Sequence, residues 1–484
     1  MYLGLDLGTS GVKALLMDEA QAVVASASAD LEVSRPASGW SEQEPQHWLD
    51  ATANALDELK RSHGALLAVV RGIGLSGQMH GATLLDADDK VLRPCILWND
   101  VRSHKEAAEL DENPAFRAQS GNIVFPGFTA PKLVWVKTHE PEIFSNVAKV
   151  LLPKDYLRLW LTGEHVSEMS DAAGTSWLDV GKRDWSDELL AATDLGREHM
   201  PRLVEGSHVS GTLRSELANR WGMGEVAVAG GAGDNAASAM GLGAIADGAA
   251  FVSLGTSGVL FASNASYSPK PESAVHAFCH AVPDTWHQMG VFLSATDSLN
   301  WWAGIAKRPV SELTQEIEGD EHAIDSAPLF LPYLSGERTP HNDARIRGAF
   351  VGLDHAHDQA TMTRSVLEGV AFALRDSLEA LASAGTSIER VMAVGGGTRS
   401  QAWLSIIADA LNVPVDLPAE GDFGAAFGAA RLGLLAAEDG DPVAVCQPPA
   451  IARSFLPDST NNEITESRYR RYRALYPALS GDKT

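Results

Sequence analysis

MYLGLDLGTSGVKALL, residues 1–16, opens the chain, and its core LGTSGV at residues 7–12 recurs at residues 254–259. Each copy places a Gly-Thr-Ser-Gly turn next to short apolar runs, which are residues 2–7 and 12–17 in the first copy. Glycine adopts positive φ angles without strain, so the pattern predicts a β-hairpin at each site. The copies lie about half of the 484-residue chain apart, which predicts two related halves.

The repeated turn also has the chemistry of a phosphate-binding loop. It offers several backbone N–H groups and two hydroxyl donors, and its glycines add no Cβ bulk. We therefore expect Gly8-Thr9-Ser10 and Gly255-Thr256-Ser257 to face each other across a cleft and to hold a polyphosphate from both sides. The alternative is that one convenient turn is used twice without a shared function.

Two aspartates are placed to act beside such a polyphosphate. Asp6 lies two residues before the first turn, and Asp234 follows a predicted strand at residues 225–230 in the sequence Gly-Ala-Gly-Asp-Asn. Because Mg²⁺ keeps most of its waters and takes one or two carboxylates, both residues are candidate ligands. The carboxylate that does not bind the ion can accept a proton from an attacking hydroxyl. The alternative for Asp234 is a plain helix N-cap.

Predicted strands and helices alternate in both halves. Helices are expected from Pro45 onward and over residues 236–244, 364–385 and 401–411, and further strands over 66–77, 391–397 and 413–418. This alternation is typical of α/β domains built on mixed sheets. We expect one domain over residues 1–245 and a second over 246–484, because the second copy of the turn follows that boundary closely.

The composition limits the classes of partner. A formal net charge of −25 repels nucleic acid and anionic membranes, so we expect neither as a partner. No apolar run approaches the roughly 20 residues of a membrane span, and no signal peptide is recognised at the start. Three widely spaced cysteines give no disulfide framework. These features predict a cytoplasmic protein.

Seven motifs in order resemble the FGGY carbohydrate kinases, and most closely the branch of that family that acts on xylulose. They are LGTSG, QMHG (78–81), WND (98–100), PKDYLRL (153–159), GDN (233–235), LSGERTPHND (334–343) and AVGGGTRS (393–400). The resemblance implies an actin-like ATPase fold, in which two ribonuclease-H-like domains enclose a central cleft. It implies transfer of the γ-phosphoryl group of Mg²⁺-bound ATP to the 5-hydroxyl of D-xylulose, and a homodimer as a common assembly.

The resemblance also assigns roles to individual residues. Met79 and His80 are expected to contact the sugar, Asn235 to hydrogen-bond it, and Asp234 to act as the catalytic base, with Asp6 near Mg²⁺. The turns that contain Gly8, Thr9, Ser10, Gly255, Thr256 and Ser257 match the family's phosphate loops.

The expected adenosine pocket combines Gly396 and Gly397 with the segment 424–428. Within that segment Phe427 is bulkier than the family pattern, so we expect it to reshape the adenine side of the pocket. Trp98 is a candidate wall of the sugar pocket.

Three other interpretations stay open on the sequence. The chain could be an FGGY kinase for ribulose, glycerol or a sugar acid, or a non-catalytic actin-like sugar sensor. His276, Cys279 and His280 give a zinc site one ligand too few, and their spacing fits a β-strand equally well.

Overall fold

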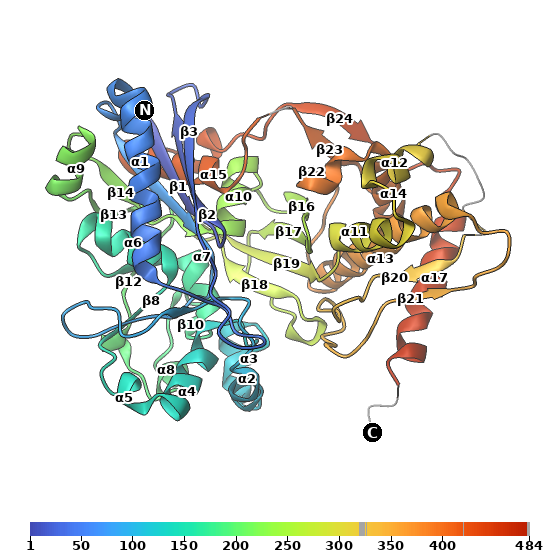
Figure 1. Ribbon diagram of the computed structural model, residues 1–484, viewed down its shortest axis with the longest axis horizontal. Helices are drawn as coiled ribbons and strands as arrows, with labels where there is room; N and C mark the ends of the chain where they lie inside the picture. The colour runs from blue at the N-terminus through green and yellow to red at the C-terminus, as the bar shows by residue number, and fades with distance from the viewer. Residues whose placement is uncertain (319–324, 326, 420, 482–484) are drawn as a thin grey trace.

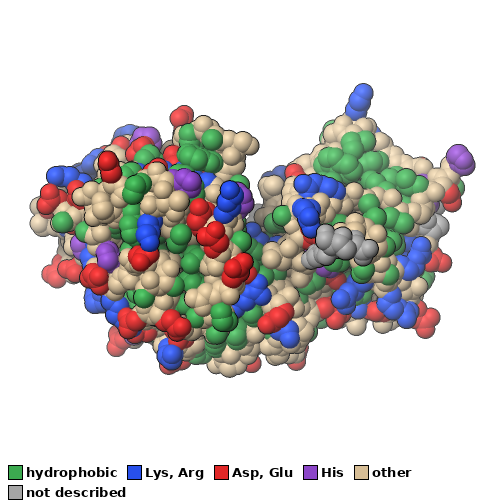
Figure 2. Space-filling model, turned by 90° about the horizontal axis from the view of Figure 1, so that it is seen from below, with side chains coloured by type: hydrophobic (Ala, Val, Ile, Leu, Met, Phe, Trp, Pro, Cys, Tyr) green, Lys and Arg blue, Asp and Glu red, His purple; other side chains and the backbone are tan. Residues whose placement is uncertain are grey.

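The computed structural model describes residues 1–318, 325, 327–419 and 421–481 of the chain. Two lobes lie side by side, each built on a twisted mixed sheet with helices packed against it (Figure 1). Figure 2 shows the surface hollowed between the lobes. None of the helices in these ranges is long and apolar enough to cross a membrane.

The two large sheets have seven strands each and share a plan. The first has the order β13-β14-β5-β1-β2-β3, with β15 beside β5, and the second has the order β18-β19-β17-β16-β22-β23-β24. In the first, the bounds are β1 Tyr2–Leu7, β2 Gly11–Met17, β3 Val23–Asp30, β5 Gly72–Gly77, β13 Val209–Thr212, β14 Ala227–Ala229 and β15 Ala232–Gly233. In the second, they are β16 Ala250–Leu254, β17 Gly258–Asn264, β18 His276–Cys279, β19 Trp286–Phe292, β22 Val391–Val394, β23 Val415–Pro418 and β24 Ile451–Phe455.

The helices of the first half are α1 Pro45–Leu67, α2 His104–Asp111, α3 Pro114–Ser120, α4 Thr129–His139, α5 Pro141–Phe144, α6 Pro153–Thr162, α7 Met169–Ala172, α8 Asp187–Ala191, α9 Ser215–Trp221 and α10 Asp234–Leu242. Those of the second are α11 Thr296–Ala306, α12 Val310–Glu316, α13 Gln359–Ser383, α14 Gln401–Leu411, α15 Ala425–Glu438, α16 Pro442–Val445 and α17 Asn462–Leu479. Short strands complete the structure: β4 Glu42–Gln43, β6 Thr83–Leu85, β7 Cys95–Ile96, β8 Lys149–Leu151, β9 Val166–Glu168, β10 Leu178–Asp179, β11 Asp184–Trp185, β12 Arg202–Val204, β20 Leu329–Leu331 and β21 Ala349–Val351.

Both repeated turns are hairpins, as the sequence predicts, although Gly8, Gly11, Gly255 and Gly258 do not adopt the expected positive φ angles. β1 and β2 pair antiparallel with Leu7 opposite Val12, and β16 and β17 pair antiparallel with Leu254 opposite Gly258. The first strand of each hairpin also runs parallel to a later strand, β5 in the first sheet and β22 in the second. Each turn therefore lies at the carboxyl end of a central strand, where ligands bind in open α/β sheets.

Two predicted strands are shorter in the structure. The strand expected over residues 66–77 begins only at Gly72, because Leu66 and the fully buried Leu67 complete the last turn of α1. The strand expected over 391–397 ends at Val394, and residues Gly396–Arg399 form a 3₁₀ turn.

Helix α15 crosses back from the second half and packs on the first sheet, as Figure 1 shows. Glycines make the close approach possible: a Cβ atom on Gly4 would lie 1.9 Å from the carbonyl oxygen of Ala426, and one on Gly74 would lie 1.7 Å from that of Ala429. The small-residue helix that the sequence predicts is α10. A Cβ atom on Gly428 of α15 would likewise collide with the carbonyl oxygen of Ala237 in α10.

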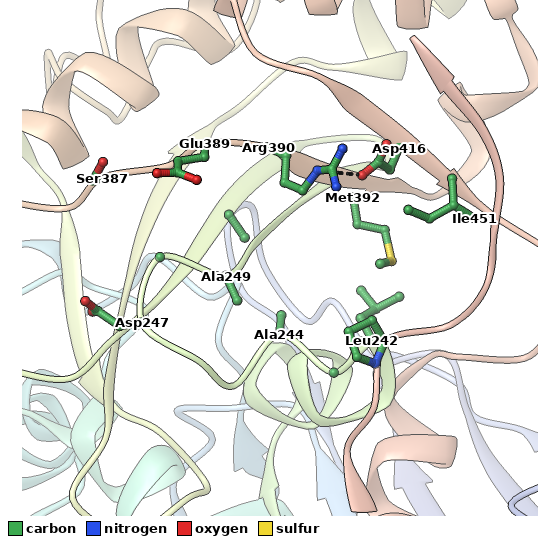
Figure 3. Close-up of a pocket in the computed structure, with 14 residues that line it drawn as sticks. Leu242, Ala244, Asp247, Ala249, Ser387, Glu389, Arg390, Met392, Asp416 and Ile451 are labelled. Carbon is green, nitrogen blue, oxygen red and sulfur yellow. Dashed lines mark ion pairs between the residues drawn. The ribbon is translucent and has the colours of Figure 1, made fainter. Parts of the chain in front are cut away.

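The chain passes between the lobes from α10 to β16, from β23 to α15 and from α16 to β24. The first and the last of these crossings border a cavity of about 600 Å³ at the hinge (Figure 3). Its walls include the end of α10 at Leu242 and an ion pair between Arg390 and Asp416, with Nε and Oδ2 3.0 Å apart. Because α10 begins at Asp234, one helix connects the hinge to the candidate base.

Candidate active site

A cavity of about 250 Å³ between the lobes brings together five residues that the sequence singled out for binding or catalysis. They are Met79, His80, Asp234, Asn235 and Ser257. Trp98, the candidate wall of the sugar pocket, also lines this cavity. The first lobe contributes the QMHG loop and the start of α10, and the second lobe contributes the second turn.

The first turn is joined to this cavity by hydrogen bonds through Thr9. The hydroxyl of Thr9 donates to Oε1 of Gln78 at 3.1 Å and accepts from the indole N–H of Trp98 at 2.9 Å. Gln43, which the sequence analysis did not identify, donates to the carbonyl oxygen of Thr9 at 2.8 Å and accepts from Gln78 at 3.0 Å. Gly8 and Ser10 complete the turn, and the Ser10 side chain is exposed.

The second turn lies between two cavities. Ser257 faces the cavity described above, while the carbonyl oxygen of Gly255 accepts from the N–H and hydroxyl of Thr296, at 2.9 and 2.8 Å. Thr296 also lines a cavity of about 640 Å³ together with Gly396 and Gly397. Thr256 is exposed. An elongated molecule could therefore lie along this turn with one end in each cavity.

Asp6 and Asp234 lie at the same edge of the first sheet. Asp6 of β1 and Ala232 of β15 both pair with Ser76 of β5, and Asp234 follows two residues after Ala232. Burial raises the pKa of Asp234 to about 6, and the negative charge of Asp6 adds to this effect. Burial also raises the pKa of Asp6. Two carboxylates in mutual repulsion favour a cation between them.

The residues present fit a magnesium ion. The buried Oδ1 atom of Asp6 has no hydrogen-bond partner among the described residues. Asp234 uses Oδ1 to accept from the backbone and side-chain nitrogens of Asn235, at 2.8 and 2.9 Å. Beside phosphates and water, Mg²⁺ ordinarily takes one or two protein carboxylates, and this site offers two.

A buried charged cluster that the sequence analysis did not assign fixes the backbone before Asp234. The hydroxyl of Ser170 accepts from the N–H of Gly233 at 3.1 Å and donates to the buried carboxyl of Glu168 at 2.9 Å. Arg158, fully buried, donates to the carbonyl oxygen of Ala229 at 2.6 Å. Both ends of the segment that leads to the candidate base are therefore held. PKDYLRL contains Arg158, but its partners are distant in sequence.

His80 has a fixed orientation and is neutral. Its Nδ1 atom lies 2.7 Å from the carbonyl oxygen of Gly174, and its ring stacks on Phe128 with centroids 4.6 Å apart. Burial lowers the pKa of His80 to about 3. A Cβ atom on Gly174 would lie 2.3 Å from the His80 ring, so this loop requires glycine.

The second lobe adds further residues to the cavity whose roles the sequence did not predict, among them His276, Phe278 and Arg338. His276 begins β18, which confirms the strand interpretation of the His-Cys-His stretch. Phe427 is buried in the core beside Tyr2 and Leu15 instead of lining the cavity at Gly396. The Phe427 side chain therefore fills space between α15 and the first sheet.

Comparisons with known proteins agree with this architecture. Residues 1–241 match the N-terminal domain and residues 250–437 the C-terminal domain of the FGGY family of carbohydrate kinases. A xylulose kinase of Escherichia coli K12 is 49% identical over 483 residues, which is 99% of each chain.

Solved structures of similar proteins share the fold. The crystal structure of a "xyloylose kinase" from Brucella ovis is 63% identical, covers 99% of both chains and superposes with a TM-score of 0.98. A xylulose kinase from Rhodospirillum rubrum is 31% identical over 99% of both chains, with a TM-score of 0.92. The two lobes thus have the actin-like ATPase fold. The chain belongs to the FGGY family of carbohydrate kinases.

Proposed function

We propose that this chain transfers the γ-phosphoryl group of ATP to the 5-hydroxyl of D-xylulose. The observation that carries the proposal is the cavity in which Met79, His80, Asp234 and Asn235 of the first lobe meet Ser257 of the second. A small polyhydroxylated molecule fits a volume of about 250 Å³. The similarity to xylulose kinases over the full chain supports D-xylulose as that molecule.

In this proposal Asp234 is the catalytic base. With a pKa of about 6 it is ionised near neutral pH, yet it is basic enough to accept the proton of an attacking hydroxyl. Phosphoryl transfer passes through a loose transition state, so the main contributions are alignment of the hydroxyl and neutralisation of charge. Asn235 keeps the Asp234 carboxylate oriented through its two hydrogen bonds.

The two turns hold the nucleotide tail in this proposal. Gly8, Thr9 and Ser10 approach it from the first lobe, and Gly255, Thr256 and Ser257 from the second. The adenosine end occupies the cavity at Gly396 and Gly397. Of the two candidate ligands Asp6 and Asp234, Asp6 would hold Mg²⁺, which neutralises phosphate charge when it is bound, and Asp234 is then left to accept the proton. We propose residues 1–245 and 246–484 as the two functional halves.

An ATP-consumption assay with a panel of acceptors tests the function. The panel contains D-xylulose, D-ribulose, glycerol, xylitol and D-gluconate, each with and without Mg²⁺. We expect the highest kcat/KM with D-xylulose and little turnover without an acceptor, because closure excludes water from the cleft. Faster turnover of another acceptor would assign a different member of the family. No turnover with any of them, with sugar binding retained, would identify a sensor.

We further propose a cytoplasmic location and a homodimeric assembly. The three cysteines are free and buried, which suits a reducing compartment. Light scattering of the purified protein measures the assembly directly.

A further inference from the structure

The candidate sugar cavity is lined by two chemically different groups of residues. Asp234 and Asn235 form one group, and the charge of Asp6 acts on Asp234. Arg338 enters the cavity from the segment between β20 and β21, and its guanidinium carbon lies 4.7 Å from the ring centre of Phe125. Phe125 belongs to the first lobe, so this contact spans the cleft.

Arg338 lies among histidine and aromatic rings. Phe125 packs on His276 with centroids 5.3 Å apart. The positive charge of Arg338 adds to burial in lowering the pKa of His80 and of His276. The pKa of Asp234 is instead affected by the charge of Asp6 and by the hydrogen bonds from Asn235. A molecule in this cavity therefore meets both the candidate base and the guanidinium of Arg338.

The guanidinium of Arg338 has its donors free for a ligand. Within the described ranges of the chain, its side chain makes no hydrogen bond or ion pair. The adjacent Glu337 carboxyl accepts from the backbone N–H groups of Leu293 and Arg338, at 3.0 and 2.8 Å. Burial raises the pKa of Glu337 to about 8, and its Oε1 atom is already used by these two backbone donors, so its carboxyl leaves the guanidinium donors of Arg338 to a ligand.

His80 supplies an acceptor in the same cavity. Its Nδ1–H donates to Gly174, which leaves Nε2 of the neutral ring with a free lone pair. A hydrogen-bond donor with positive charge next to a neutral acceptor is complementary to an α-hydroxyketone, in which a carbonyl oxygen accepts and the neighbouring hydroxyl donates.

The proposed reaction itself requires that such a group be present. A 2-ketopentose closes into a five-membered ring when O5 adds to the C2 carbonyl, so the ring form has no free 5-hydroxyl. Only the open chain offers O5 to the base, and the open chain always carries a free ketone at C2. Phosphorylation at O5 therefore presents a carbonyl oxygen three carbons away from the reacting end.

We propose that Arg338 binds the C2 carbonyl oxygen of the open-chain ketose and is a specificity-determining residue. The cleft-spanning contact with Phe125 orients the guanidinium for this bond. The proposal rests on the proposed function, because it takes a ketose phosphorylated at O5 as the substrate. It makes the carbonyl the feature by which the cavity separates a ketose from the corresponding polyol.

The test compares D-xylulose with xylitol, which has the same carbon skeleton and a hydroxyl at C2. For the wild type and Arg338→Met we measure kcat and KM for D-xylulose, and the inhibition constant of xylitol as a competitive inhibitor. A hydrogen bond to a charged donor predicts a KM increase of about 10- to 100-fold, with kcat largely retained. The xylitol constant should change by less than about threefold. Arg61→Met, at an exposed arginine of α1, is the matched control and should leave all three constants unchanged.

Two further variants guard against a general folding defect. Arg338→Lys keeps the charge but loses the forked donors, so its KM should lie between those of the wild type and Arg338→Met. Phe125→Leu removes the ring under the guanidinium and should raise the KM for D-xylulose more than the xylitol constant. Equal losses for D-xylulose and xylitol, or an unchanged KM in Arg338→Met, would overturn the proposal for Arg338. A wild type inactive on D-xylulose would instead overturn the proposed function.

Discussion

The hydroxyl of Ser170 accepts the backbone N–H of Gly233 at 3.1 Å, one residue before the candidate base Asp234. The same hydroxyl donates to Glu168, which is completely buried. Ser170 is therefore a positioning residue: it does not line the cavity but determines where the chain enters α10.

Removing this hydroxyl should impair the chemical step more than sugar binding. In Ser170→Ala the buried N–H of Gly233 loses its partner, at a cost of about 1–3 kcal/mol, and the carboxylate of Asp234 shifts. We expect kcat to fall about tenfold with KM within about threefold of wild type, and the pH midpoint of kcat/KM to move. Ser405→Ala, on the exposed face of α14, is the control. An unchanged pH midpoint would argue against the positioning role.

Asp234→Ala should abolish most turnover. Loss of a general base is expected to lower kcat by about 10²- to 10⁴-fold, with a smaller change in KM. Asp247→Asn, an exposed carboxylate beyond the far end of α10, is the matched control and should behave as wild type. Steady-state kinetics with D-xylulose and ATP give both constants. Turnover of Asp234→Ala close to that of the wild type would refute its assignment as the base.

Activity and stability should respond to pH in opposite senses through Asp234. The ionised form accepts the proton, so kcat/KM should fall as the pH drops below about 6. The folded state raises this pKa above the unfolded value, so the folded protein binds more protons between these values and loses stability as the pH rises. Asp234→Asn should therefore have a higher Tm than the wild type at pH 8. The difference in Tm between Asp234→Asn and the wild type should disappear below a pH of about 4, where the side chain at position 234 is neutral in both proteins.

Asp6→Asn should weaken the response to magnesium. The amide keeps the shape of the side chain but loses the charge of the buried Oδ1 atom, which is without a partner in the described chain. We expect the Mg²⁺ concentration for half-maximal rate to rise about tenfold or more, while the KM for D-xylulose changes little. Asp50→Asn, exposed on α1, controls for the loss of one negative charge. A parallel rise in Asp50→Asn would attribute the effect to net charge.

Gly74→Ala should destabilise the fold. The added Cβ atom would lie 1.7 Å from the carbonyl oxygen of Ala429, so α15 must move off the first sheet. Overpacking of this kind costs about 1–3 kcal/mol or more. Gly64→Ala in α1 has nothing within 4 Å of the added methyl group and should keep or slightly raise the Tm. Equal melting temperatures for the two variants in thermal denaturation would contradict this account of the packing.

The local features of this fold were predictable from the sequence. Both hairpins follow from glycine-bracketed turns between apolar runs, and α14 has its predicted bounds, Gln401–Leu411. The predicted start of β5 was wrong by several residues, because the apolar residues Leu66 and Leu67 suit the end of a helix as well as a strand.

The candidate site was predictable only in part. The resemblance to a family selected Met79, His80, Asp234 and Asn235, and the structure brings them into one cavity. Arg338 lies within the motif LSGERTPHND, but its role was not predicted, because its contact with Phe125 depends on how the two lobes meet. The sheet on which α15 packs could not be predicted for the same reason, because its small apolar residues would suit either sheet.

The return of α15 to the first sheet limits how this chain can exchange parts with its relatives. A hybrid spliced at residue 245 would place a foreign helix on the host's β1 and β5, where Gly4 and Gly74 leave no room for a displaced backbone. Viable recombinants should therefore transfer residues 425–446 together with the first half. Segments that are in contact in the folded protein must therefore be exchanged together, even where they are far apart in the gene.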